Sequence, residues 1–132
     1  MSWFVDASAL VAILGAEADS DILADRLDEE DELIWSAVSI WESAVAISRR
    51  LSAPIEETQQ LLAEFGKARG LTLVPIGADE TRMALAAFAR FGKHSGHPAQ
   101  LNMGDCFAYA CAKANDARLL YKGNDFAQTD LA

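Results

Sequence analysis

Short apolar runs alternate along this chain with longer stretches in which apolar side chains recur every three or four residues. The short runs predict strands, at residues 3–5, 33–35, 71–74 and 118–121. The longer stretches predict six helices. Their ranges are 9–14, 22–27, about 37–51, 54–70, about 79–91 and about 103–114. Strands separated by helices form βα units, in which the strands are parallel. We therefore expect one domain over residues 1–132, an α/β fold built as a three-layer α/β/α sandwich around a central, mainly parallel sheet.

Residue types at the predicted boundaries support these elements. Ser36 is a good N-cap for the helix over about 37–51, Pro54 suits the first turn of the next helix, and Gly70 suits its end. The segment 92–101 contains two Gly and one Pro, so it is predicted to be a loop within the domain.

Composition excludes several classes of protein. Of the 132 residues, 52% are hydrophobic and 23% are charged, which excludes a disordered or fibrous chain. No window approaches the roughly 18 to 20 apolar residues that span a bilayer, and the first residues lack the features of a signal peptide. Cys106 and Cys111 would lie about 140° apart on a helix, so we expect neither a disulfide nor a zinc site. These features are typical of a soluble, cytoplasmic protein with no membrane partner.

The formal net charge of −9 is concentrated in one segment. Residues 17–32 hold nine acidic residues and one basic residue, a net charge of −8, which leaves −1 for the rest of the chain. The acidity is therefore local and does not exclude a polyanionic substrate. We interpret the segment either as a solvated helix face with a charged turn or as a docking surface for a basic partner.

Two acidic side chains in the first half of the chain are candidates for chemistry. Asp6 follows the first strand and precedes a helix, so it is either an N-cap or a carboxylate at the edge where parallel sheets bind ligands. Glu42 lies on its predicted helix between two apolar stripes. Solvation explains that position poorly because an unpaired buried charge is costly. We interpret Glu42 as a site residue, with an ion pair as the alternative.

Two further candidates lie in the last third of the chain. Asp105 opens the helix over about 103–114, where the helix dipole alone favours an acidic residue. Asp125 follows the last strand, in a turn where Asp is common for conformational reasons. If the first and last strands are neighbours, both acids converge with Asp6 on one edge, and Glu42 reaches the same cleft. Crowded carboxylates repel one another unless a cation neutralises them, and a site with only oxygen ligands suits Mg²⁺ or Mn²⁺.

Four stretches around these acids resemble one family of proteins. They are Phe4-Val5-Asp6-Ala7-Ser8-Ala9-Leu10, Ser36 through Glu42, Leu101 through Ala110, and Leu120 through Phe126 with Thr129-Asp130. The four acids are 36, 63 and 20 residues apart in order, so the resemblance spans nearly the whole chain. With these motifs the sequence resembles the PIN-domain ribonucleases of the VapC toxin group, from type II toxin–antitoxin pairs.

The resemblance implies a site, an activity and partners. The four acidic positions of the PIN site are then Asp6, Glu42, Asp105 and Asp125. These four carboxylates are expected to hold one or two Mg²⁺ ions, with Asp6 and Asp105 as the first candidates for direct ligands and Mn²⁺ as the alternative metal. The implied reaction is hydrolysis of an RNA phosphodiester bond by water, leaving a 3′-hydroxyl and a 5′-phosphate. The implied partners are a second copy of the chain in a homodimer, and a cognate VapB-like antitoxin that enters the acidic cleft in a toxin–antitoxin hetero-oligomer.

Other residues offer weaker sites. Ser8 and Thr129 resemble positions whose hydroxyls support a PIN site, although capping explains Ser8 equally well. Ser8 with His94 or His97 lacks the Gly-x-Ser-x-Gly turn of a hydrolase, and both histidines are expected to be solvent-exposed. With the neighbouring Arg and Lys they form the most basic loop, which suits either RNA contact or an ordinary surface. The three tryptophans are expected in the core, at positions Trp3, Trp35 and Trp41.

Two other functions remain open. One is a PIN nuclease that acts in RNA maturation without an antitoxin, and the other is a non-catalytic PIN-like binding module. The four intact acids argue against the binding module, which has no need of clustered carboxylates. A small neighbouring reading frame with a basic DNA-binding N-terminus would separate a toxin from a maturation enzyme.

Overall fold

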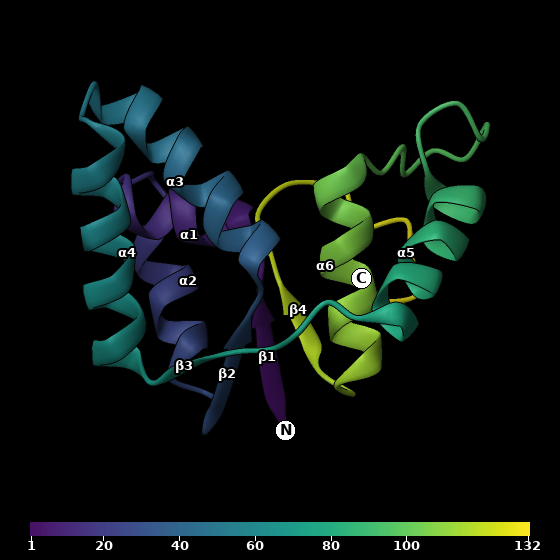
Figure 1. Cartoon of the computed structure of the whole chain (residues 1–132), viewed down its shortest axis with the longest axis horizontal. Helices are drawn as coiled ribbons and strands as arrows, with labels where there is room; N and C mark the ends of the chain where they lie inside the picture. The colour runs from purple at the N-terminus through teal and green to yellow at the C-terminus, as the bar shows by residue number, and fades with distance from the viewer.

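The predicted sheet is present in the computed structural model, which describes residues 1–132 (Figure 1). Its four strands are β1 (Ser2–Val5), β2 (Glu32–Trp35), β3 (Leu71–Leu73) and β4 (Arg118–Leu120). All neighbouring strands are parallel, and their order across the sheet is β3-β2-β1-β4. In this register Phe4 pairs with Ile34 on one side and with Leu119 on the other. The first and last strands are therefore neighbours, which is the condition for the acids to converge.

Six helices cover the two faces of the sheet. They are α1 (Ala7–Leu14), α2 (Ser20–Leu27), α3 (Ala37–Leu51), α4 (Ile55–Arg69), α5 (Ala78–Phe91) and α6 (Met103–Ala114). Helices α1 to α4 lie to one side of the sheet and helices α5 and α6 to the other (Figure 1). This arrangement confirms the predicted three-layer α/β/α sandwich. Strands β3 and β4 each end one residue earlier than predicted.

Alternation of side chains along the strands divides the core into two halves. Phe4 and Ile34 pack with residues of α5 and α6, whereas Trp3 and Trp35 pack with residues of α1 to α4. Successive side chains of a strand point to opposite faces, and helices on both faces bury a parallel sheet completely. This is why the strands read as continuous apolar runs in the sequence.

Two of the predicted helix boundaries are formed by the residues expected there, Ser36 and Gly70. Ser36 caps α3 in a reciprocal arrangement with Ser39: each hydroxyl accepts a hydrogen bond from the other residue's backbone N–H, over 3.3 and 2.9 Å. Gly70 ends α4 with a φ of +69°, a left-handed conformation that glycine adopts without strain. These contacts confirm Ser36 as the cap and Gly70 as the helix end.

The prediction that all three tryptophans are buried is wrong for one of them. Trp3 and Trp35 are buried, but the Trp41 side chain is 65% exposed. Helix α3 buries a face that includes Ser39 and Ser43, whose hydroxyls donate to the backbone carbonyls of the cap residue Ser36 and of Ser39. Because these serines satisfy their own polar groups, they take core positions, and Trp41 lies on the other side of the helix.

The structure shows the state of the two cysteines and the character of the helices. Cys106 and Cys111 form no disulfide, as predicted; both are buried, and burial raises the pKa of each thiol to about 11. Such thiols stay protonated and unreactive at neutral pH. None of the helices combines the length and the apolar character that crossing a bilayer requires.

The acidic segment 17–32 is partly an internal partner for basic side chains. Four of its nine acids form ion pairs with distant groups: Glu17 with Arg50 and Lys122, Asp19 with Lys122, Asp28 with Arg69, and Glu30 with Arg118 and the N-terminal amine. The interpretations of the segment as a solvated face or a docking surface did not include this role.

Candidate functional site

The four predicted acids come from four different elements. Asp6 directly follows β1, and Asp125 lies in the turn after the neighbouring strand β4. Asp105 lies in the first turn of α6, and Glu42 lies on α3. Asp6 and Asp105 are only 4% and 9% exposed, whereas Glu42 is half-buried and Asp125 is exposed.

Asp6 is both a helix cap and a member of the carboxylate group. Its Oδ2 accepts hydrogen bonds from the Ser8 backbone N–H, over 3.0 Å, and from the Ser8 hydroxyl, over 2.5 Å. Its own backbone N–H donates to the carbonyl of Leu120 over 3.0 Å, which joins the ends of β1 and β4. The cap therefore orients the carboxylate at the carboxyl end of the sheet, so the two interpretations of Asp6 are compatible.

Asp105 is held by a reciprocal cap at the start of α6. The Asn102 backbone N–H donates to Asp105 Oδ2 over 3.1 Å, and the Asp105 backbone N–H donates to Asn102 Oδ1 over 2.9 Å. Two hydrogen bonds between the same two residues restrict the rotation of the Asp105 side chain. The carboxylate is thus oriented before any ligand binds.

Glu42 reaches the site because Gly104 has no side chain. A Cβ built on Gly104 would lie only 2.0 Å from Glu42 Oε2, so the carboxylate lies directly against the backbone of the residue before Asp105. No basic side chain forms an ion pair with Glu42. The alternative interpretation of Glu42 as half of an ion pair is therefore wrong.

The carboxylates act on one another electrostatically. Burial raises the pKa of Asp6, and the charge of Asp125 adds to the rise even though the Ser8 hydrogen bonds oppose it. Burial raises the pKa of Asp105 to about 7, with contributions from the charges of Asp125 and Asp6. Burial also raises the pKa of Glu42, and the charge of Asp6 adds to it. Asp6 therefore interacts with all three other acids, which places the four in one electrostatic group.

The donor chemistry of this group fits a hard divalent cation. All four side chains offer oxygen atoms, the ligands that Mg²⁺ and Mn²⁺ take. No three Asp, Glu, His or Cys side chains are positioned to hold one ion together. Mg²⁺ commonly takes only one or two carboxylates and keeps several water ligands, so a site for this ion does not require three protein side chains.

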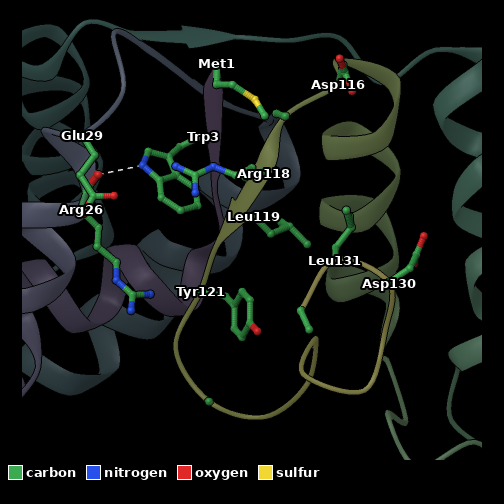
Figure 2. A pocket seen from close by; sticks show the side chains of 13 residues that line it. Met1, Trp3, Arg26, Glu29, Asp116, Arg118, Leu119, Tyr121, Asp130 and Leu131 are labelled. Carbon is green, nitrogen blue, oxygen red and sulfur yellow. Dashed lines mark hydrogen bonds between the residues drawn. The ribbon is translucent and has the colours of Figure 1, made fainter.

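The hollow that Glu42 lines is not the largest in the molecule. A pocket of about 490 Å³ is lined by Ser8, Glu42, Glu17 and Lys122, among others. A larger pocket, of about 800 Å³, lies along the outer edge of β4 (Figure 2). There the Arg118 guanidinium stacks 3.9 Å from the Trp3 ring centre, and none of the four acids contributes to the lining. Of the four acids only Glu42 lines the smaller hollow, so the candidate site is identified by the group of carboxylates itself and not by a pocket.

The hydroxyls of Ser8 and Thr129 have different roles. Ser8 contacts Asp6 directly, as described above. The Thr129 hydroxyl donates to the carbonyl of Phe126 and accepts from the backbone N–H of Leu131, over 2.8 and 3.1 Å. Thr129 therefore braces the C-terminal turn and makes no hydrogen bond to any of the four acids.

The two histidines lie outside the carboxylate group. His94 is exposed, as predicted, but His97 is half-buried. The Nδ1 atom of His97 accepts a hydrogen bond from the Ala99 backbone over 3.1 Å, and its ring packs edge-on against Phe91, with ring centres 4.9 Å apart. These contacts make His97 a structural part of the loop 92–101.

Sequence reasoning missed three residues that shape the site. Asn102 orients Asp105, Gly104 admits Glu42, and Lys122 borders the hollow. A glycine in the first turn of a helix is a poor helix former, and that signal was available for Gly104. No local pattern marks Lys122, because its partners lie more than 100 residues away in the chain.

Comparisons with known proteins agree with this arrangement. The PIN domain family model matches residues 3–131. A VapC ribonuclease of Rhizobium meliloti is 43% identical over 139 residues, which cover 97% of this chain and 98% of that protein. The chain belongs to the VapC group of the PIN-domain family. Ribonuclease VapC28 of Mycobacterium tuberculosis is 42% identical over 133 residues, covering 95% of this chain and 92% of that protein.

A solved VapC structure has the same fold. The crystal structure of Mycobacterium tuberculosis VapC20, a toxin that cleaves the sarcin–ricin loop, matches with a TM-score of 0.73 and covers 95% of this chain and 92% of that one. The two sequences are 17% identical, so this likeness concerns the fold alone.

Proposed function

We propose that this chain is a Mg²⁺-dependent endoribonuclease toxin that hydrolyses RNA phosphodiester bonds. The observation that carries the proposal is a group of four mutually repelling carboxylates, two of them buried, at the carboxyl edge of a parallel sheet in a VapC family member. Their repulsion opposes folding unless a cation offsets it. The ribonuclease names of the relatives support RNA as the substrate.

Asp6 and Asp105 are the residues that would hold the ion, and Mn²⁺ would suit them as well. The ion would lower the pKa of a water molecule and offset charge on the scissile phosphate. Ser8 and Asn102 fix the orientation of these two carboxylates through the hydrogen bonds already described. Preorganised ligands of this kind lose little rotational freedom on binding.

Glu42 and Asp125 would complete the reaction site. The raised pKa of Glu42 makes its carboxylate a better proton acceptor, which suits a base that takes a proton from the attacking water. Asp125 is exposed on its turn, and its charge favours keeping a cation at the neighbouring Asp6 and Asp105.

Removal of divalent metal tests the proposed chemistry. We expect purified protein to cleave total RNA with Mg²⁺, to lose that cleavage with excess EDTA, and to regain it when Mg²⁺ is restored. A denaturing gel of the RNA measures the loss and recovery, and Ca²⁺ in place of Mg²⁺ serves as a control for non-specific ionic effects. Cleavage that persists in EDTA after exhaustive dialysis would exclude the metal-dependent mechanism.

The proposal includes a cytoplasmic homodimer and a cognate VapB-like antitoxin. A group of four acids is suited to accept an Arg or Lys of the antitoxin in place of the metal, as in other charge-assisted pairs. Co-expression with the product of a small neighbouring reading frame should give a stable hetero-oligomer with suppressed cleavage. Separate elution of the two proteins at micromolar concentration in size-exclusion chromatography would instead favour a maturation nuclease without an antitoxin.

A further inference from the structure

We infer that Glu17, Asp19 and Lys122 form a clamp that holds the turn carrying Asp125, so that Lys122 is a positioning residue of the carboxylate site. This inference rests on the proposed function, to which it adds residues outside the four acids. Together these three residues are the Lys122 clamp.

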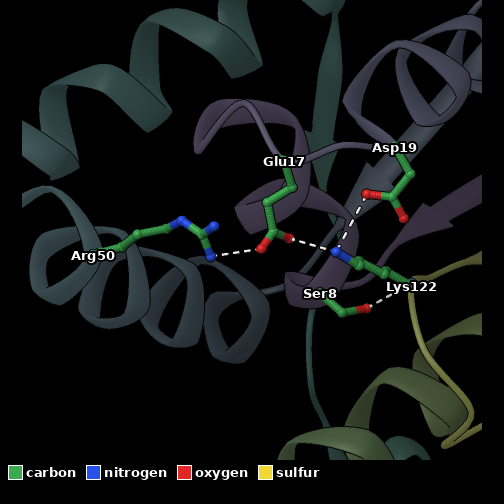
Figure 3. Close-up of polar contacts among 5 residues, drawn as sticks. All are labelled: Ser8, Glu17, Asp19, Arg50 and Lys122. Carbon is green, nitrogen blue, oxygen red and sulfur yellow. Dashed lines mark hydrogen bonds and ion pairs between the residues drawn. The ribbon is translucent and has the colours of Figure 1, made fainter.

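The clamp joins the turn after β4 to the connection between α1 and α2. Lys122 Nζ lies 3.0 Å from Glu17 Oε1 and 3.3 Å from Asp19 Oδ1 (Figure 3). Glu17 is itself fixed, because its Oε2 lies 2.5 Å from Arg50 Nη1 of α3 and its backbone N–H donates to the carbonyl of Ala12 in α1. Only 16% of the Glu17 side chain is exposed, so the carboxylate is a firm anchor for Lys122.

A second contact ties the same residue to the site. The Lys122 backbone N–H donates to the Ser8 hydroxyl oxygen over 3.0 Å, and that hydroxyl donates to Asp6 Oδ2. Lys122 is therefore attached by its backbone to the hydrogen bonds of Asp6 and by its side chain to Glu17. The hydrogen bond with Lys122 lowers the pKa of Glu17, and the hydrogen bond with Glu17 raises the pKa of Lys122, so both are ionised at neutral pH.

These contacts set the place of Asp125. The turn continues from Lys122 through Gly123, whose φ is +97°, to Phe126, which is buried and packs against Tyr121. Lys122 at one end and Phe126 at the other thus hold a short segment in which Asp125 is exposed. Because the Asp125 charge acts on Asp6 and Asp105, displacement of the turn changes the field at both.

Lys122 also borders the hollow that Glu42 lines, so direct contact with an RNA phosphate is the competing role. The two roles predict different effects. A phosphate-binding lysine affects KM for RNA and leaves Mg²⁺ binding unchanged, whereas a positioning lysine affects Mg²⁺ binding and kcat.

The test compares Lys122→Met, Lys122→Arg and Arg69→Gln. Lys122→Met removes the charge, and we expect it to weaken Mg²⁺ binding about tenfold, measured by calorimetry and by the Mg²⁺-dependent rise in Tm. We expect kcat to fall in parallel, with KM for RNA nearly unchanged. Lys122→Arg keeps the charge and should restore most of the Mg²⁺ affinity. Arg69→Gln is the matched control, since it removes a basic partner of Asp28 in the same acidic segment without touching Glu17, Asp19 or the turn.

Amide hydrogen exchange in the metal-free protein gives a readout that needs neither metal nor RNA. We expect Lys122→Met to speed exchange at residues 122–126 relative to wild type and to Arg69→Gln. Unchanged exchange there, or a rise in KM with unchanged Mg²⁺ binding, would overturn the clamp. A wild-type protein that shows no Mg²⁺-dependent cleavage would contradict the proposed function instead, and the exchange result would still decide the clamp.

Discussion

Asp105→Asn is expected to reduce Mg²⁺-dependent RNA cleavage by roughly 100-fold or more while leaving the fold intact. The amide has the shape of the carboxylate, and its oxygen can still accept the hydrogen bond that the Asn102 backbone N–H donates to Asp105. The substitution therefore keeps the cap and removes the charge. If Asp105 were only a favourable first-turn residue, the loss of charge would cost well under about 1 kcal/mol and leave cleavage intact.

The same substitution should change how the stability of the metal-free protein depends on pH. Burial and the neighbouring charges raise the pKa of Asp105 in the folded state from 3.8 to about 7. The folded protein therefore binds more protons than the unfolded chain between about pH 4 and pH 7, so its stability falls as the pH rises through that range. We expect on the order of 2 kcal/mol of this loss to come from Asp105, the full shift being reduced by solvent screening.

Thermal melts of metal-free protein between pH 4 and pH 8 measure this effect. At pH 8 Asp105→Asn should melt above wild type, and the difference should shrink steadily as the pH falls to about 4. Asp79→Asn is the matched control, because Asp79 is a first-turn acid of α5 and lies on an exposed surface. Full cleavage by Asp105→Asn, or parallel melting curves for it and wild type across the pH range, would contradict the assignment of Asp105 to the metal site.

Gly104→Ala is expected to lower cleavage by roughly 100-fold without destabilising the protein. The new methyl group would meet Glu42 Oε2 at 2.0 Å, and its nearest neighbours all belong to the Glu42 carboxylate. That carboxylate is the end of a flexible side chain, so it moves aside while the helices stay in place. A displacement of about 1 Å at a reacting group costs on the order of 100-fold in rate. Alanine also favours a helix over glycine by roughly 0.5–1 kcal/mol, so Tm should be unchanged or higher.

A double-mutant comparison separates this effect from general damage. Glu42→Ala removes the carboxylate, so adding Gly104→Ala to it should lower cleavage no further. Cleavage rates and melting temperatures of the two single variants and the double variant provide the test. Wild-type cleavage by Gly104→Ala, or additive losses in the double variant, would show that the contact between Gly104 and Glu42 does not position the carboxylate.

The elements of the fold could be predicted because their signals are local. Apolar runs of three or four residues marked the strands, helical periodicity marked the helices, and Ser36 and Gly70 marked boundaries through their own hydrogen bonding and backbone conformation. The separation of the strands by helices was enough to predict a parallel three-layer sandwich. Trp41 was wrongly predicted to be buried. Two serines occupy the buried face of α3 instead, because their hydroxyls donate hydrogen bonds to nearby backbone carbonyls.

The sequence by itself determined which carboxylates are candidates, through their places after strands and at helix starts and through their resemblance to one family. Their mutual arrangement was decided by the tertiary structure alone. Only the pairing of β1 with β4 joins Asp6 to the turn of Asp125, and only the approach of α3 to α6 brings Glu42 against Gly104. The contact between Glu17 and Lys122 spans 105 residues of chain. Such contacts depend on how whole elements pack, and no periodicity or short motif encodes the distance between side chains that packing brings together.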